Sequence, residues 1–598
     1  MATQFFSRKN LNFTLYDVHN AEELTQYPLF QDHSRETFDM VLDMNTDIAE
    51  RILQPAYVDS DRKQPELVDG QVKVHPAVHQ YIKAMGEAGL IGAPFSFDHG
   101  GQQLPEMVNA AGEFIRGSAH NSFVMFTGLA SGSSHLILQF GSEELIHTYT
   151  PNMLSGKWGG TMCLTEPNAG SSLSDLTTVA HLQADGTYRI EGQKIFISAG
   201  DQDYAENIIH LVLARIDGAP KGTKGISLFV VPKKKIVADG LADNGVISTG
   251  VYHKMGQKAT PAMHLTFEGS EGHLVGEANK GLSYMFLMMN GARLGVGLGG
   301  AYIASAAYYA SLEYAKERPQ GRRVNNKNLD QGPTHIINHP DVRRMLLFQK
   351  AIMEGCLSLI TECHKWGDMI KVTEGEEKAK YQALLDLMTT VAKTYPSEMG
   401  IQAVNQGLQV FGGFGYTEDF PLEQMARDVR IMSIYEGTTG IQSLTLLGRG
   451  IPANGGKSAQ LLFAEVLKTI DDAQTFDDLK PYAEKLQGEL NRLQKVTMHL
   501  LGLAAKGDNE IFLADATLYM EVFGIISVAW QWLKQGVVAK RALVTQNPTG
   551  EDLVFLESKI VTMKYFFHYE VPKIVGLATR LTDNEVLTLV SEEVEYAV

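Results

Sequence analysis

The spacing of apolar residues divides this chain into helical stretches at both ends and a strand-rich stretch between them. Residues 33–53 and 78–92 carry apolar side chains three and four positions apart, which predicts amphipathic helices. Gly89 and Gly92 lie where the second of these helices should end. Residues 35–157 are therefore expected to be mostly helical.

From about Trp158 the pattern changes to short β-rich runs, separated by Gly, Asp and Pro residues that favour turns. These runs lie at residues 187–200, 207–216, 225–236 and 262–269. They predict a β-domain inserted between two helical parts of the chain.

Helical periodicity returns at about Lys280, and a Gly/Pro/Ser-rich stretch at 450–460 is typical of a linker. Beyond it, Leu556, Ile560, Met563 and Phe567 fall on one stripe of a further helix. The predicted fold class is mainly α with an inserted β-domain. The expected domains are an N-terminal extension (1–34), a helical domain (35–157), a middle β-domain (158–279), a helical bundle (280–450) and a C-terminal helical extension (451–598).

Composition limits the classes of protein to which the chain can belong. With 598 residues, 44% hydrophobic and 20% charged, it is expected to form several packed globular units. Its net charge of −17 argues against nucleic acid as a general partner. Three scattered cysteines give neither a disulfide framework nor a metal site, and they are typical of a reducing compartment.

The chain shows no sign of membrane insertion or export. Its first twenty residues contain no apolar core of signal-peptide length. No window approaches the roughly 18 uninterrupted apolar residues of a membrane span. The most apolar late stretch, residues 523–533, is interpreted as a buried helix. We therefore expect a cytoplasmic protein without an integral membrane span.

A G-x-G-x-x-G pattern occurs at Gly295, Gly297 and Gly300. A dinucleotide-binding loop with this pattern follows a strand and opens a helix. Here the preceding residues 282–294 have a helical pattern, so we interpret the glycines as small residues that let two helices pack closely.

Two motifs in the β-rich region carry candidate chemistry. Residues 162–171, MCLTEPNAGS, begin as a strand and turn at Pro167, so that Gly170 and Ser171 offer groups for a phosphate or the edge of a flavin ring. Residues 194–198, KIFIS, could place two further side chains beside the same pocket. Taken alone, each motif is better explained as an ordinary strand with its turn.

Two more motifs lie near the end of the helical bundle. Residues 409–430 contain Gly412, Gly413 and Gly415, whose backbone could approach a pyrophosphate or simply end a helix. Residues 434–440, IYEGTTG, place Glu436 between an aromatic residue and a glycine. A carboxylate in such apolar surroundings is near water, paired, or kept for chemistry.

These four motifs, with KMGQKAT (254–260) and YAKER (314–318) between them, resemble the acyl-CoA dehydrogenase family over residues 35–450. The C-terminal extension resembles the longer members, such as the very-long-chain enzymes and the 3-methylmercaptopropionyl-CoA dehydrogenase group. The resemblance implies a helical N-domain, a β-barrel-like middle domain and a four-helix-bundle C-domain, followed by an extra helical domain.

The resemblance also implies the reaction, which is FAD-dependent α,β-dehydrogenation of a saturated acyl-CoA to the trans-2-enoyl-CoA, as in fatty acid β-oxidation. Glu436 would take the α-proton, and the β-hydride would go to flavin N5. A carboxylate suits this role when poor hydration raises its pKa. The backbone N–H of Glu436 would help to hold the thioester carbonyl. Electrons would pass to an electron-transfer flavoprotein, and the enzyme would be a homodimer.

Matching positions extend the resemblance to individual residues. The expected FAD contacts, some of them across a subunit interface, are Met162, Leu164, Thr165, Gly170, Ser171, Phe196, Ser198, Arg318, Gln409, Gly412, Gly413, Gly437, Thr438 and Gly440. The expected substrate contacts are Ser171, Asn290, Arg293, Tyr435 and Glu436. Asn290 stands where the family usually has Asp, and Gly440 where Gln is common. The residues after Arg318 read Pro-Gln-Gly in place of the usual Phe-Gly.

Several alternatives remain open at the level of sequence. An acyl-CoA oxidase would use oxygen as the electron acceptor, and a non-catalytic relative would keep the fold for assembly. The retained Glu436 and flavin motifs argue against the second. The acyl group could carry a thioether, as in 3-methylmercaptopropionyl-CoA, or be an unsubstituted chain of medium or long length.

Overall fold

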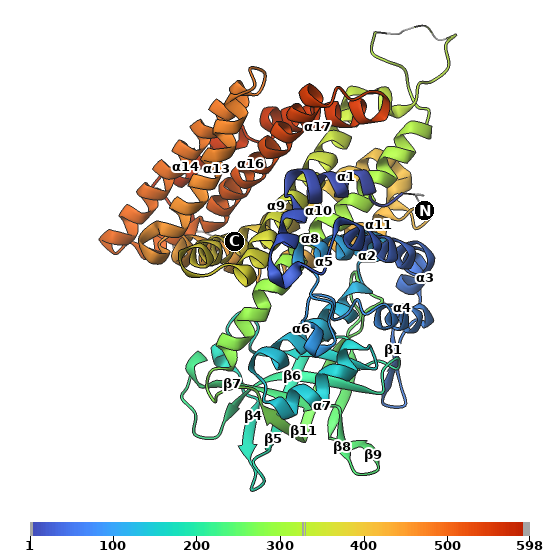
Figure 1. Cartoon of the computed structure of the whole chain (residues 1–598), viewed down its shortest axis with the longest axis vertical. Coiled ribbons are helices and arrows are strands. Elements are labelled where there is room, and N and C mark those ends of the chain that lie inside the picture. Colours follow the sequence, from blue (N-terminus) through green and yellow to red (C-terminus); the bar gives the residue numbers. More distant parts are fainter. Residues whose placement is uncertain (1–3, 326–327, 329, 590–598) are drawn as a thin grey trace, which may run out of the picture. The chain divides into compact units, whose positions relative to one another are not determined.

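The computed structural model of the chain describes residues 4–325, 328 and 330–589, without the side chains of residues 286–289 (Figure 1). The chain divides into two compact units. Unit I is Pro28–Ala292, and unit II combines Met1–Tyr27 with Arg293–Val598. Segments from both ends of the sequence therefore share one unit.

The first half of unit I is helical, as the apolar spacing predicts. Ser34 begins the first helix with a capping box, in which its backbone N–H donates to Thr37 Oγ1 at 2.8 Å. The second predicted helix ends at Glu87, just before Gly89, whose φ is +65°. A hairpin of two short strands was not predicted. The elements are α2 (Arg35–Ile48), α3 (Gln54–Arg62), β1 (Glu66–Val68), β2 (Gln71–Lys73), α4 (Pro76–Glu87), α5 (Glu106–Ala119), α6 (Val124–Phe140) and α7 (Glu143–Leu154).

The second half of unit I is a β-domain, and the four predicted β-rich runs all contain strands. The strands of its main sheet are β3 (Trp158–Cys163), β4 (Val179–Leu182), β5 (Tyr188–Ser198), β6 (Asn207–Ile216), β7 (Ile226–Pro232), β10 (Val246–Val251) and β11 (Ala262–Leu274). β8 (Lys234–Val237) and β9 (Gly240–Asp243) form a separate two-stranded ribbon.

The main sheet closes on itself. Its strand order is β10-β11-β5-β4-β6-β3, and β7 pairs with both β11 and β6. The strands β11, β5, β4, β6 and β7 therefore form a ring, which is the barrel-like arrangement that the sequence predicts. β3 is added to the outside of this ring, parallel to β6.

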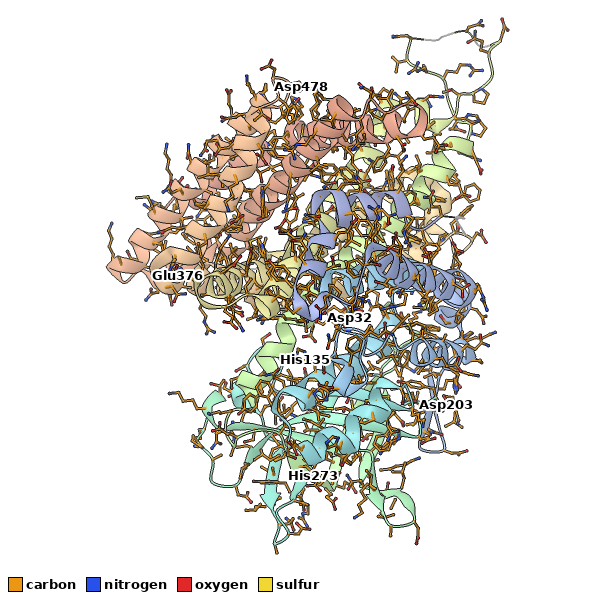
Figure 2. All side chains as sticks on the ribbon, in the orientation of Figure 1. Asp32, His135, Asp203, His273, Glu376 and Asp478 are labelled. Atoms are coloured by element: carbon orange, nitrogen blue, oxygen red, sulfur yellow. The ribbon has the colours of Figure 1, made fainter. Side chains whose placement is uncertain are left out.

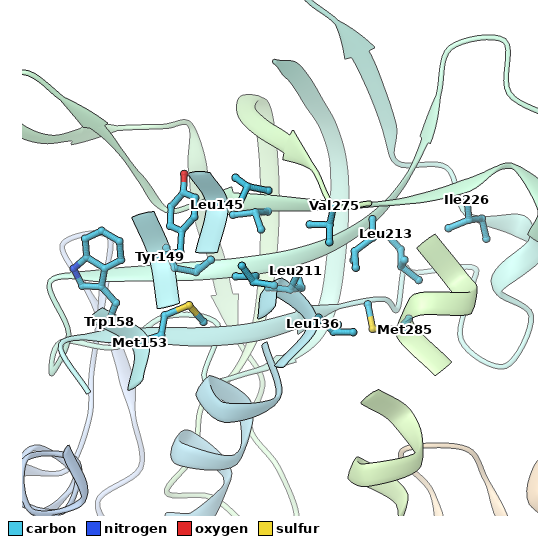
Figure 3. Packing of buried hydrophobic residues seen from close by; sticks show 14 of the residues in the cluster. Leu136, Leu145, Tyr149, Met153, Trp158, Leu211, Leu213, Ile226, Val275 and Met285 are labelled. Carbon is cyan, nitrogen blue, oxygen red and sulfur yellow. The ribbon is translucent and has the colours of Figure 1, made fainter. Parts of the chain in front are cut away.

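Helices α6 and α7 cover one side of this sheet and supply its core (Figure 3). Leu136 of α6 and Met153 of α7 are almost completely buried in a cluster with Leu211 and Leu213 of β6. Because β6 lies between helices and other strands, eight consecutive residues from Asn207 are buried. This core fixes the end of β3, which carries the MCLTEPNAGS motif.

Unit II is built from long helices. They are α1 (Arg8–Asn12), most of α8 (Gly281–Glu317), α9 (Pro340–Val372), α10 (Gly375–Phe411), α11 (Leu422–Val429), α12 (Thr439–Thr445), α13 (Lys457–Gln474), α14 (Lys480–Lys506), α15 (Asn509–Ala514), α16 (Ala516–Thr545), α17 (Gly550–Tyr569) and α18 (Lys573–Leu581). The predicted linker at 450–460 is shorter than expected, since α13 already begins at Lys457.

The glycine pattern in α8 serves helix packing, as predicted. A Cβ on Gly297 would lie 1.9 Å from the carbonyl oxygen of Ala392 in α10, and one on Gly300 would lie 2.3 Å from that of Pro396. The two backbones approach too closely for any side chain at these positions. The segment is helical, so it is not a dinucleotide-binding loop.

Buried charges join the C-terminal extension to the rest of unit II. Lys559 of α17 donates to Glu354 of α9 at 2.8 Å, and both side chains are almost fully buried. Eight residues further along α9, Glu362 pairs with Lys534 of α16 and lies 3.1 Å from His19. Because a buried charge is stable only when paired, these bonds fix how the extension packs.

Within the extension, α13, α14 and α16 contact one another side by side (Figure 1). Asp478, labelled in Figure 2, precedes α14 and forms an ion pair of 2.8 Å with Lys540 of α16. The predicted stripe on α17 is confirmed, since Leu556, Ile560 and Met563 are all buried.

The most apolar late stretch of the sequence lies in α16. α16 is long and apolar enough to cross a membrane by length and composition, because the run at 523–533 is the centre of a 30-residue helix. In the structure 89% of its most apolar window is buried inside the protein. The interpretation of this run as a buried helix is confirmed.

Candidate functional site

The IYEGTTG motif forms a sharp connection in unit II, between a 3-10 turn (Arg430–Ser433) and α12. Glu436 has φ of +53° and Gly437 has φ of +90°, so two successive residues adopt left-handed conformations. Such a conformation is unusual for a glutamate, and it marks a position where the surrounding structure determines the backbone.

Gln442 of α12 holds this connection in place. Its Nε2 donates to the backbone carbonyl of Glu436 at 3.0 Å. A Cβ on Gly437 would lie 2.4 Å from that same nitrogen, so only glycine leaves room for the bond. Thr438 caps α12, accepting from the N–H of Ile441 at 3.3 Å, and Gly440 follows in the first turn. These contacts hold the backbone of Glu436 in its left-handed conformation.

Burial and nearby positive charges act in opposite directions on the pKa of Glu436. The side chain is partly buried, and burial raises its pKa, while the positive charges of Arg293 and Lys393 act to lower it. Arg293 lies on α8 and Lys393 on α10, and both residues are buried. A carboxylate whose pKa is raised towards neutrality is suited to accept a proton from carbon.

Tyr435 contacts the same turn, its hydroxyl lying 3.1 Å from the sulfur of Met432. Met432 in turn packs at Gly299 of α8, where an added Cβ would lie 2.7 Å from its methyl group. The turn before Glu436 is thus packed against the helix that carries Arg293.

A second group of predicted residues gathers at the ends of α8 and α10. Arg318 is exposed just beyond α8, with its guanidinium 5.7 Å from the ring centre of Phe414. Gln409, Gly412 and Gly413 are exposed as well, and neither glycine has a neighbouring atom within 4 Å of an added Cβ. An accessible backbone beside an arginine suits a diphosphate group.

In unit I, hydrogen bonds join the MCLTEPNAGS and KIFIS motifs. The N–H of Ile195 donates to the carbonyl of Thr165 at 2.9 Å, and Lys194 Nζ donates to the carbonyl of Leu164 at 3.1 Å. Two backbone hydrogen bonds between Glu166 and Ala169, of 3.0 and 3.1 Å, close the turn that precedes Gly170 and Ser171.

A buried ion pair supports this turn from inside. Lys194 Nζ donates to Glu166 at 2.8 Å, and Thr178 Oγ1 donates to the same carboxylate at 2.6 Å. Although burial raises the pKa of Glu166, the charge of Lys194 and the hydrogen bonds bring it down to about 2. The carboxylate is therefore ionised and serves the structure of the turn.

The surface above this turn is suited to a flat aromatic group. Phe196 is 58% exposed and has φ of +58°, so the strand presents its ring to the outside. Tyr252 lies beside it, with ring centres 4.5 Å apart. Met162, Leu164, Thr165 and Ser198 are partly buried, while Gly170 and Ser171 are exposed. The stacking surface and the open turn of unit I suit a flat aromatic group such as a flavin ring.

The predicted residues divide between the two units. Residues 162–198 and Asn290, which is partly buried on α8, belong to unit I, while Arg293 and residues 318–440 belong to unit II. In the described part of the chain, no cluster of three or more His, Cys, Asp or Glu side chains could hold a metal.

Sequence reasoning missed the groups that support the predicted ones, namely Glu166, Lys194, Lys393, Glu398 and Gln442. Glu166 and Lys194 lie inside the quoted motifs, and a charged residue within each β-rich run is the signal that could have identified the pair. Lys393 is a lysine within an otherwise uncharged stretch of α10, residues 387–397. No sequence signal indicates that Gln442 bonds to Glu436.

Family models for acyl-CoA dehydrogenases match most of the chain. The N-terminal domain model matches residues 35–157, the middle domain model 161–270 and the C-terminal domain model 279–451. A model described as acetyl-CoA dehydrogenase C-terminal like matches residues 462–589. The helical extension is thus a recognised domain that accompanies the other three.

Similar proteins are known at full length. A 3-methylmercaptopropionyl-CoA dehydrogenase of Ruegeria pomeroyi is 35% identical over 89% of this chain and 90% of its own. A butyryl-CoA dehydrogenase of Syntrophomonas wolfei is 31% identical over 98% of both. A Bacillus anthracis acyl-CoA dehydrogenase solved in complex with FAD superposes with a TM-score of 0.73, at 23% identity over 93% of this chain and 90% of that one.

Proposed function

The chain belongs to the acyl-CoA dehydrogenase family, and on that premise we propose that Glu436 is the base with which this FAD-dependent oxidoreductase removes the α-proton of a saturated acyl-CoA. The product is the trans-2-enoyl-CoA. The observation that carries this assignment is a partly buried carboxylate with a raised pKa, held on a left-handed backbone.

The raised pKa of Glu436 matters because the α C–H of a thioester is a weak acid. A base is most effective when its pKa lies near the working pH, since it is then both ionised and able to hold the proton. The positive charges of Arg293 and Lys393 lower the pKa of Glu436, and so they offset part of the increase that burial causes. When FAD is bound, it supplies the oxidising power by accepting two electrons with the β-hydrogen.

The backbone of Glu436 supports a second role. Its N–H makes no hydrogen bond to any residue in the described part of the chain. We assign this N–H to the thioester carbonyl, whose oxygen gains negative charge as the α-proton leaves. One residue would then provide both the base and a donor for the developing charge, and Gln442 would fix their relative geometry.

We propose that the substrate contacts Ser171, Asn290, Arg293 and Tyr435. We propose that FAD contacts the residues expected from the sequence at 162–198, 318, 409–413 and 437–440. The residues present fit these roles as described above. Asn290, in place of the family's usual Asp, carries no charge and could both donate and accept hydrogen bonds in its contact with the CoA moiety.

For the substrate we propose a linear acyl-CoA with a short to medium chain. Two full-length relatives, at 35% and 31% identity, are named for 3-methylmercaptopropionyl-CoA and butyryl-CoA. These acyl groups share an unbranched chain, and a thioether sulfur occupies nearly the space of a methylene group. We further propose an electron-transfer flavoprotein as acceptor, a homodimer, a cytoplasmic location, and the five-part division of the chain set out from its sequence.

The test is an anaerobic titration of the FAD-loaded protein with acyl-CoAs of graded length and with 3-methylmercaptopropionyl-CoA, followed by visible absorption. Bleaching by one class is expected, and Glu436→Gln should slow it by about 10²–10⁴-fold. Glu484→Gln, an exposed carboxylate on α14, is the control and should match the wild type. If no acyl-CoA bleaches the protein, the proposed substrate class is wrong.

The same preparation separates dehydrogenase from oxidase. After bleaching, admission of oxygen should return the colour slowly and with little peroxide, while an electron-transfer flavoprotein should return it fast. Rapid stoichiometric peroxide formation would instead establish the oxidase.

A further inference from the structure

Lys393 is an exception among the buried lysines of this protein. Lys194 and Lys559 are each fully buried and each donates to a carboxylate, at 2.8 Å in both cases. Lys393 is equally buried, with no exposed surface, yet its Nζ has no hydrogen-bond partner within the described residues. A buried ammonium without a hydrogen bond is unfavourable, so its presence requires an explanation.

The packing of α8 on α10 determines where this ammonium lies. A Cβ on Gly297 would be 1.9 Å from the carbonyl oxygen of Ala392 and 3.3 Å from the Cα of Lys393. The turn of α10 that carries Lys393 therefore lies directly against α8 at Gly297. Arg293 precedes Gly297 by four residues, so it lies on the same face of α8, one turn away. The positively charged side chains of Arg293 and Lys393 therefore come from two different helices, α8 and α10.

Four charged groups meet at this level of unit II. Lys393 interacts with the carboxylates of Glu398 and Glu436 and with the guanidinium of Arg293. Glu436 interacts with Arg293 and Lys393. Glu398, five residues after Lys393 on α10, accepts a hydrogen bond from the hydroxyl of Thr439 at the start of α12. Glu436 has no such hydroxyl donor among the described residues, so its ionised form depends on the two cations.

We infer that Lys393 is a positioning residue for the proposed reaction, whose buried ammonium keeps the Glu436 carboxylate ionised and ready to accept the α-proton. Since no carboxylate among the described residues is hydrogen-bonded to it, its positive charge is not neutralised in a direct ion pair and can act on Glu436. The inference rests on the proposed function of Glu436 as base.

The titration behaviour of the two groups agrees with this geometry. Burial lowers the pKa of Lys393 to about 8, so that it remains mostly charged at neutral pH. Burial raises the pKa of Glu436, and Arg293 and Lys393 are the groups that oppose this effect. With Lys393 neutral, Arg293 alone would oppose the burial of the carboxylate.

The test compares Lys393→Met, which keeps the length of the side chain without its charge, with Lys393→Arg, which keeps the charge. The matched control is Lys380→Met, because Lys380 lies on the same helix and pairs with Glu465 at 2.6 Å. Full-length, FAD-loaded protein is used throughout, and Lys393→Gln is a second neutral variant if the first folds poorly.

The first measurement is turnover against pH, with the acyl-CoA that bleaches the wild type. In the wild type, turnover should fall at low pH as Glu436 becomes protonated. In Lys393→Met the midpoint of this fall should move upward by about one to three pH units, since an opposite charge at close range lowers a carboxyl pKa by that amount. A shift of one unit reduces turnover about tenfold at pH values below the midpoint. Lys393→Arg should return the midpoint towards the wild type, and Lys380→Met should leave it unchanged.

The second measurement does not depend on activity. The infrared band of the protonated Glu436 carboxyl, identified by its loss in Glu436→Gln, is followed against pH in substrate-free protein. Its midpoint should shift upward in Lys393→Met. An unmoved midpoint, or an equal shift in Lys380→Met, would overturn the inference. If no acyl-CoA bleaches the wild type, the proposed function fails, but the infrared titration still decides whether Lys393 acts on Glu436.

Discussion

Replacing Gly297 with alanine would place a methyl group where α8 meets the backbone of α10. The added Cβ would lie 1.9 Å from the carbonyl oxygen of Ala392, whereas ordinary contact begins at 3.4 Å. The helices would have to separate by the difference, about 1.5 Å, because a backbone carbonyl within a helix cannot rotate away.

Two free-energy terms determine the size of the effect. Overpacking of a filled contact costs about 1–3 kcal/mol, and more when backbone must move. Alanine in a helix regains about 0.5–1 kcal/mol relative to glycine. Gly297→Ala should therefore be destabilising overall, by roughly 1–2 kcal/mol. A displacement of about 1 Å at a catalytic group can reduce turnover about 10²-fold, and Lys393 lies next to the contact.

The assay combines thermal unfolding with the turnover of the FAD-loaded enzyme. The control is Gly488→Ala on α14, where an added Cβ meets no atom within 4 Å and should raise the unfolding midpoint slightly. We expect Gly297→Ala to lower the midpoint by a few degrees and to lose most of its turnover. A variant with the midpoint and turnover of the wild type would show that the two helices do not touch at this position.

Two further predictions concern buried groups away from Glu436. Because the pKa of Glu166 falls from 4.5 to about 2 on folding, its ionised form stabilises the protein above pH 4.5, and this contribution is lost as the pH falls towards 2. Its upper limit is about 3 kcal/mol, so the stability advantage over Glu166→Gln in denaturant unfolding should shrink across that pH window, and a constant difference would contradict the assignment. The thiols of Cys163, Cys356 and Cys363 are buried, which raises the pKa of Cys163 to about 12 and those of the other two as well. Iodoacetamide at pH 8 should therefore label none of them in the native protein and all three after unfolding, and rapid native labelling would show that a thiol is accessible.

Local patterns were sufficient for much of the fold. Helices over 33–53 and 78–92, strands in all four β-rich runs and the stripe on α17 follow from apolar spacing, because each element must turn one face to a core. The hairpin at Glu66–Lys73 was missed, since three-residue strands carry too little periodicity to be distinguished from a turn.

By itself, the sequence of this protein determined its family, its order of helical and β-rich regions, and the residues that motifs identify one by one. Only the tertiary structure brought Lys393 and Arg293 to Glu436, paired Glu166 with Lys194 across 28 positions, and left one buried lysine without a hydrogen bond. The physical reason is that apolar spacing is a property of neighbouring residues, whereas the pKa of a buried group depends on charges that folding collects from distant segments.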